Sequence, residues 1–189
     1  MSDMVDAAPA ALARLVEFVN TRRADGDTIG TPEELTSWLH AHELLPIGAA
    51  DTAAQERAVR VREGLRALLA TNNAEPVTSP RPDGLNPRAR AELAALTATL
   101  PLSLDVTSTP PRLVPNTDDV VDHALTTLLA DVATAVAAGT WSRLKTCREP
   151  SCRWAFYDHS RNRGRTWCSM DVCGNRVKVR ASHRRNATR

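Results

Sequence analysis

All four cysteines of the chain lie in one short segment, at positions 147, 152, 168 and 173. They form two C-x4-C pairs, and fifteen residues separate the pairs. Zn²⁺ in a structural site takes four ligands in a tetrahedron, with each thiolate sulfur about 2.3 Å from the metal. Two ligands a few residues apart can reach one ion from a tight turn, and the intervening residues are enough for a hairpin that returns the second pair. The spacing predicts one structural zinc ion, held by Cys147, Cys152, Cys168 and Cys173.

Two disulfides, free thiols and a catalytic zinc are the alternatives for these cysteines. The N-terminal residues MSDMVDAAPA lack the basic region of a secretory signal, which disfavours disulfides. Free buried thiols would not cluster in two pairs. Four cysteines leave no open coordination position, which disfavours catalysis by the metal. His159 could replace one ligand, but with four cysteines present we expect it to be solvated.

The residues around the cysteines indicate the elements that position them. Residues 153–157 resemble a strand, 160–165 a polar turn, and 166–168 a returning strand that delivers Cys168. Ser169 is a good N-cap for a helix, so Cys173 would lie in its first turn, where the helix dipole favours a thiolate. A turn, a hairpin and a helix with the last ligand predict a small treble-clef-like zinc finger. The helix would bury one apolar stripe: Met170, Cys173, Val177 and Ala181.

Charge divides the chain into two parts. Residues 141–189 hold 13 Lys and Arg against 3 Asp and Glu, a net charge of +10. Residues 1–140 hold 11 basic and 19 acidic residues, a net charge of −8. This asymmetry predicts a basic module for nucleic acid on an acidic body. Spacing places Arg176, Arg180 and His183 on one helix face for a DNA groove, and the arginines of the polar turn near phosphates. Asn175 could read adenine or support the metal site. The candidate DNA contacts are Arg161, Arg163, Arg165, Asn175, Arg176, Lys178, Arg180, His183, Arg184 and Arg185.

The first 140 residues predict a mainly α-helical domain with a minor β-hairpin. Apolar periodicity and capping residues predict helices over about 9–23, 32–39, 50–70, 86–100 and 118–138, the last capped by Thr117 and ended by Gly139. Thr31-Pro32-Glu33-Glu34 has the pattern of a capping box. The segments LSLDV and RLVP, joined by a proline-rich turn, predict a short edge hairpin. We therefore expect an α+β domain over residues 1–140 and a zinc finger over 141–189.

The body offers no catalytic signature, so we do not expect an enzyme. His40 and His42, two residues apart, would point to different faces of a helix rather than bind one metal. Asn20 and Thr21 interrupt an apolar helix near Trp38, and the three could line a small-molecule pocket, although hydrogen bonding at a helix end is the alternative. The chain has no run of about eighteen uncharged apolar residues. We expect a soluble, cytoplasmic protein without a membrane span.

The motif Cys173-Gly174-Asn175-Arg176, with the preceding WSRLKTCREPSCRWAFYDHSRNRGRTWCSMDV, closely resembles the CGNR zinc-finger family of bacterial proteins. This resemblance covers about residues 141–184. The body resembles the ABATE domain found ahead of that finger, chiefly through LVEFVNT at residues 15–21 and the order of helices. The combined resemblance implies a stress-responsive transcription regulator that binds DNA.

Charge and resemblance together predict a zinc-dependent regulator that binds double-stranded DNA through the finger. The body would sense a small-molecule effector or mediate assembly, and a homodimer is expected because one small finger buries little DNA surface. The alternative is an RNA- or ribosome-associated zinc protein, in which aromatic side chains stack on unpaired bases. The aromatic candidates for this stacking are Trp154, Phe156, Tyr157 and Trp167. A third hypothesis is a nuclease, for which Asp158-His159 and Asp171 are the groups that could bind a second metal.

Overall fold

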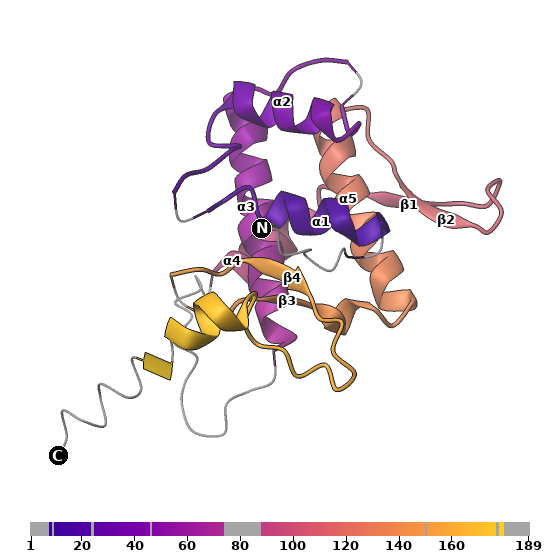
Figure 1. The fold of residues 1–189 in the computed structure, drawn as a ribbon. Helices are drawn as coiled ribbons and strands as arrows, with labels where there is room; N and C mark the ends of the chain where they lie inside the picture. The colour runs from indigo at the N-terminus through magenta and orange to yellow at the C-terminus, as the bar shows by residue number, and fades with distance from the viewer. Residues whose placement is uncertain are drawn as a thin grey trace.

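A computed structural model describes residues 8, 10–23, 25–45, 47–73, 88–149, 151–176 and 178–179. Five α-helices, two antiparallel strand pairs and short turns of other helix types occur in this part of the chain (Figure 1). The predicted α+β class with a small C-terminal finger is confirmed. The elements are α1 Ala10–Val19, α2 Pro32–Ala41, α3 Thr52–Thr71, α4 Ala89–Thr97, β1 Leu102–Asp105, β2 Arg112–Pro115, α5 Val120–Ala137, η1 Trp141–Arg143, β3 Leu144–Thr146, β4 Ala155–Tyr157 and η2 Met170–Gly174.

Helix α1 ends at Val19, earlier than predicted. The hydroxyl of Thr21 donates to the carbonyl of Phe18 at 2.8 Å, which satisfies an acceptor at the helix end. The chain then turns back, because the Thr28 N–H donates to the Thr21 carbonyl at 2.9 Å. The expectation that Asn20 and Thr21 interrupt a helix is wrong, since both follow its last turn. The alternative expectation, a helix-end hydrogen bond, holds for Thr21.

The N-termini of α2 and α5 show how side chains fix helix starts. The Thr31 hydroxyl accepts from the Glu34 N–H at 3.2 Å, and the Glu34 carboxylate accepts from the Thr31 N–H at 3.0 Å, so the predicted capping box is confirmed. Helix α5 is capped by Asp119 rather than Thr117, because its carboxylate accepts from two N–H groups of the first turn. Gly139 follows α5 with φ +67°, as expected for a residue that ends a helix. The predicted start of the fourth helix at residues 86–87 lies outside the described residues, and α4 begins at Ala89.

The hydrophobic core is shared by the helices and the finger. Its buried members include Leu15 and Phe18 of α1, Leu65 of α3 and Leu125 of α5. Leu144 of β3 and Ala155 of β4 belong to the same cluster, and both have no exposed surface. In Figure 1, β3 and β4 lie beside α3 and α1. In the part of the chain that the structure describes, the finger strands therefore share the core of the body.

Strands β1 and β2 form the predicted hairpin, which extends away from the helices in Figure 1. Leu104 pairs with Leu113 in the antiparallel register, and both side chains are exposed. The exposure agrees with an edge-like hairpin held mainly by its own backbone bonds and by contact with α5.

Helix α5 is long and apolar enough to cross a membrane by length and composition alone. Val121, Leu125 and Leu128 of this helix are buried in the core. Asp131 on the same helix pairs with Arg14 of α1 at 2.9 Å. These contacts are those of a core helix.

The finger hairpin differs from the predicted one. Strand β4 pairs antiparallel with β3, which precedes the first cysteine, and not with residues 166–168. The first cysteine pair consequently forms the turn between the two strands. Residues 166–168 are not a strand, although the Thr166 carbonyl accepts one hydrogen bond from the Arg148 N–H at 3.1 Å. A sequence of three residues is too short for its pattern to distinguish a strand from an extended loop.

Candidate metal centre

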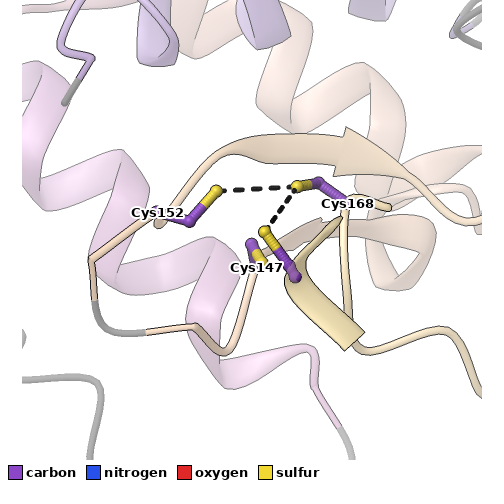
Figure 2. Close-up of side chains that lie close together, drawn as sticks. Cys147, Cys152 and Cys168 are labelled. Carbon is purple, nitrogen blue, oxygen red and sulfur yellow. Dashed lines mark hydrogen bonds between the residues drawn. The ribbon is translucent and has the colours of Figure 1, made fainter. Parts of the chain in front are cut away.

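The four cysteine sulfurs lie close together. Figure 2 labels three of these residues, Cys147, Cys152 and Cys168. All four lie within 4.8 Å of one another, and none is in a disulfide. The Cys152 and Cys168 sulfurs are 3.5 Å apart, and those of Cys168 and Cys173 are 3.6 Å apart. A tetrahedral zinc with sulfur ligands at about 2.3 Å requires sulfur–sulfur separations of about 3.8 Å. The donor type, number and spacing therefore fit one structural zinc ion.

Backbone hydrogen bonds shape the turn that carries the first two ligands. The Cys147 N–H donates to the Trp154 carbonyl at 2.8 Å, and the Cys152 N–H donates to the Glu149 carbonyl at 2.9 Å. Arg153 has φ +52°, in the left-handed region, which turns the chain from Cys152 into β4. The Glu149 side chain is fully buried and accepts from the Ser151 hydroxyl at 2.8 Å. This turn presents both sulfurs to the metal position.

A tight helical turn carries the last ligand. The Ser169 hydroxyl caps it by accepting from the Val172 N–H at 3.3 Å, as predicted. The N–H groups of Cys173 and Gly174 both donate to the Ser169 carbonyl at 3.1 Å, which widens η2 to π-helical geometry. A Cβ on Gly174 would lie 3.1 Å from the Met170 sulfur. Glycine at this position thus leaves room for the Met170 side chain.

The crowding of the sulfurs separates their acidities. A hydrogen bond from the Cys147 thiol lowers the pKa of Cys152 to about 2, whereas hydrogen bonds with Cys147 and Cys152 raise the pKa of Cys168. The same hydrogen bond to Cys152 raises the pKa of Cys147 to about 12. One thiolate is therefore stabilised by its neighbours, and further ionisation places like charges together. A divalent cation among the sulfurs removes this repulsion.

A buried ion pair that the sequence did not reveal holds the loop between the two cysteine pairs. Lys145 and Asp158 are 1% and 0% exposed, and the Lys145 ammonium donates to the Asp158 carboxylate at 2.7 Å. The ammonium also donates to the carbonyls of Arg163 and Arg165. The carboxylate accepts from the Ser160 hydroxyl at 2.6 Å. Burial raises the pKa of Asp158, but the bonds from Lys145 and Ser160 outweigh it, and the net pKa is lowered.

The three arginines of the loop differ in their surroundings. The Arg165 guanidinium donates to the carbonyls of Trp167 and Cys168 and lies 5.0 Å from the centre of the Phe156 ring. Arg165 thus supports a metal ligand. Arg163 is exposed and donates to the Ser142 hydroxyl at 2.8 Å, while Arg161 is exposed.

The last helix comprises η2 and the helical residues 175, 176, 178 and 179, and Arg176 and Lys178 on it are exposed. The Asn175 side chain donates to the Asp171 carbonyl at 2.9 Å. This hydrogen bond lies within the last helix and agrees with a structural role for Asn175 beside the metal site. Four further predicted DNA contacts lie outside the described residues: Arg180, His183, Arg184 and Arg185.

The three residues predicted for a small-molecule pocket line one cavity of about 560 Å³: Asn20, Thr21 and Trp38. Trp154 of the finger lines the same cavity. His42, on its wall, stacks on Trp38 with ring centres 3.9 Å apart and lies 3.0 Å from the Glu17 carboxylate. His40 instead lies 3.2 Å from the Gly48 carbonyl, so the two histidines do not share a site.

Side chains of the body hold the finger strands through buried hydrogen bonds. The Asn20 amide donates to the Ala155 carbonyl at 2.9 Å and accepts from the Ala155 N–H at 2.7 Å. Asn73 donates to the Thr146 carbonyl at 2.8 Å. Arg66 donates to the Arg153 carbonyl at 2.9 Å. Both strands and the metal-binding turn are therefore anchored on the helical body.

These features define a helical domain with an attached four-cysteine zinc finger. Comparison with family models matches residues 12–140 to ABATE, described as "Putative stress-induced transcription regulator", and residues 143–186 to the CGNR zinc finger. The chain belongs to the ABATE family and carries a CGNR zinc finger, in the order that the resemblance implied. Comparison with curated protein sequences gives no match.

Proposed function

We propose that the protein is a zinc-dependent transcription regulator that binds double-stranded DNA through its finger. The observation that supports this most is the exposed basic surface built around the metal centre. Arg161 and Arg163 on the loop and Arg176 and Lys178 on the last helix are exposed, and residues 141–189 carry a net charge of +10. Such side chains neutralise phosphates and steer association with DNA.

The role of the zinc in this proposal is structural. The ion would hold the loop and the last helix in a fixed relation, because the cysteines at either end of the loop bind the same metal. The body anchors the finger strands and the metal-binding turn through Asn20, Arg66 and Asn73. A cytoplasmic homodimer whose body senses a small-molecule effector completes the proposal.

Two other functions receive less support. Stacking on unpaired RNA bases requires accessible rings, but Phe156 is buried and contacted by Arg165, while Trp154, Tyr157 and Trp167 are partly buried. A nuclease built on Asp158 would need that carboxylate for a second metal. Asp158 is instead fully buried and bound to Lys145.

The test compares charge removal on the finger with matched charge removal on the body. Arg161→Ala/Arg176→Ala is set against Arg60→Ala/Arg90→Ala, which removes two exposed arginines from α3 and α4. Fluorescence anisotropy with duplex DNA at several salt concentrations should show weaker binding for the finger variant only. Its salt slope should fall by about 2, since each phosphate contact contributes about 0.9. Equal loss in both variants, or tighter binding to RNA competitor, would refute the proposal.

The full chain is required in this assay. A chain that ends near residue 139 would remove Leu144 and Ala155 from the core and leave Asn20 and Asn73 without their backbone partners. Loss of DNA binding by such a fragment would therefore report unfolding as much as loss of the binding surface.

A further inference from the structure

A second cavity lies where the body meets the metal-binding turn, and we propose that it binds a small molecule carrying a carboxylate or phosphate group. This junction pocket has a volume of about 520 Å³. Five arginines line it, from the segment after α1, from α3 and from the finger: Arg22, Arg23, Arg62, Arg66 and Arg153. Among the described residues, the carboxylates that line the same space are Asp27 and Glu63.

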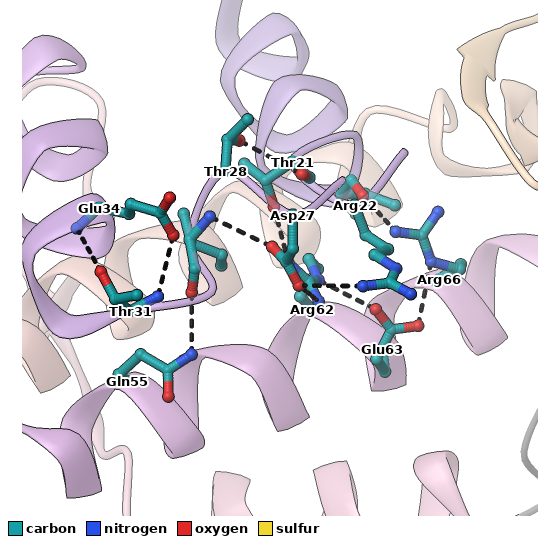
Figure 3. Close-up of polar contacts among 12 residues, drawn as sticks. Thr21, Arg22, Asp27, Thr28, Thr31, Glu34, Gln55, Arg62, Glu63 and Arg66 are labelled. Atoms are coloured by element: carbon teal, nitrogen blue, oxygen red, sulfur yellow. Dashed lines mark hydrogen bonds and ion pairs between the residues drawn. The ribbon is translucent and has the colours of Figure 1, made fainter. Parts of the chain in front are cut away.

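Both carboxylates are already occupied by the two deepest arginines (Figure 3). The Arg62 guanidinium donates to both oxygens of Asp27, at 2.6 and 2.8 Å, and to Glu63 at 2.9 Å. Arg66 donates to the other Glu63 oxygen at 3.1 Å. Arg62 and Arg66 are each 2% exposed. The free-energy cost of burying their charges is offset by these bonds and by those from Arg66 to the Val19 and Arg153 carbonyls.

Among the described lining residues, Arg22 and Arg23 are exposed at the rim of the pocket and add two positive charges to it. Arg22 reaches Asp27 only at 3.8 Å, and Arg23 lies over the Trp154 ring, 5.4 Å from its centre. Burial lowers the pKa of Arg66, and the cations Arg62 and Arg153 lower it further against the opposing effect of Glu63. A bound anion would relieve this concentration of like charge.

The shape of the pocket favours a small anion over the DNA backbone. Its volume falls within the range of about 300–1,000 Å³ that is typical of small-molecule sites. Arg62 and Arg66 lie at its floor and are nearly inaccessible, so a duplex phosphate would meet only the rim. The N–H donors of a guanidinium group can pair with two oxygens of a carboxylate or a phosphate.

The pocket also contacts the metal centre. Ser151, the zinc ligand Cys152 and Arg153 form its finger side, and Arg66 donates from the pocket floor to the Arg153 carbonyl. An anion that draws Arg66 or Arg153 toward itself acts on the turn that carries two ligands. Resting on the proposed function, we infer that the anion is an effector that changes DNA affinity.

The experiment titrates anions into the zinc-loaded full chain by calorimetry, without DNA. Inorganic phosphate, glycerol 3-phosphate and succinate separate phosphate from carboxylate binding and hold zinc weakly. Arg22→Ala/Arg23→Ala, at the exposed rim, should weaken binding at least about tenfold, the effect of losing one charged hydrogen bond. Arg60→Ala/Arg90→Ala, outside the pocket, should bind as the wild type does.

Absence of binding at millimolar concentration for all three anions, or equal weakening in both double variants, would overturn the site. DNA that competes with the anion, together with a matching loss of DNA affinity in the rim variant, would make the pocket a DNA contact instead. DNA affinity measured with saturating anion should change at least threefold, and no change would remove the effector role. Anion binding is measured without DNA, so a failure of DNA binding alone would contradict only the proposed function.

Discussion

Replacing Asn20 with alanine tests how strongly the finger depends on the body. The Asn20 amide makes two hydrogen bonds with the Ala155 backbone, and both residues are buried. Asn20→Ala leaves the Ala155 N–H and carbonyl unsatisfied, at a cost of about 1–3 kcal/mol for each group. Water in the adjacent cavity beside Trp38 would recover part of that cost. We therefore expect a loss of about 2–3 kcal/mol in the free energy of unfolding.

Urea denaturation of the zinc-loaded chain measures this loss. Tryptophan fluorescence and release of zinc to a chromophoric chelator should change together, because Ala155 belongs to the common core. Asn162→Ala, at an exposed position of the finger loop, is the matched control and should change stability by less than about 0.5 kcal/mol. Asn20→Asp keeps an acceptor for the Ala155 N–H but places a carboxylate against the Ala155 carbonyl, so it should also destabilise the protein. A loss below about 1 kcal/mol for Asn20→Ala would refute the anchoring role.

Three further predictions concern the metal and the buried charges. Cys168→Ser should lower the melting temperature of the whole chain in a single transition followed by circular dichroism; a helical signal that survives loss of zinc would contradict the common core. Lys145→Met should destabilise the protein by about 3–5 kcal/mol because it leaves Asp158 buried without its partner, whereas Lys145→Met/Asp158→Leu should recover part of the loss in urea titrations. The pKa of Asp27 is lowered because bonds from Arg62 outweigh the effect of burial, so its contribution is present above the unfolded pKa of about 3.9 and is lost as pH falls through the folded pKa. Asp27→Asn should therefore be less stable than wild type at pH 7, and this difference should shrink below about pH 4; a difference that grows in acid would show the opposite sign.

The metal ligands and the helix caps were predictable because each depends on residues close together in the sequence. The cysteine spacing identified the metal ligands because two pairs on tight turns suffice to enclose one ion. The capping box at Thr31 and Glu34 was predictable because both bonds join residues three apart. Ser169 was predictable as an N-cap and Gly139 as a helix end because both roles depend on residues nearby in the sequence.

Long-range partners were not predictable in this way. Nothing near β4 indicates that it pairs with β3, because a three-residue strand has too short a pattern to select between two neighbours. Arg165 resembled a DNA contact by charge and neighbourhood, but its guanidinium bonds to the Trp167 and Cys168 carbonyls. Arg62 and Arg66 gave no sign of burial, since arginines on a long helix are ordinarily exposed.

The buried arginines of α3 and the metal centre form one connected structure. Arg66 joins the end of α1, through the Val19 carbonyl, to the metal-binding turn, through the Arg153 carbonyl. Metal binding contributes to folding wherever the site forms only in the folded chain. Because β3, β4 and this turn contact the body, that contribution stabilises the helices as well as the finger. Conversely, a change in the body at Arg66 acts directly on a zinc-binding loop. This reciprocal coupling gives the proposed effector a physical route to the proposed DNA-binding surface.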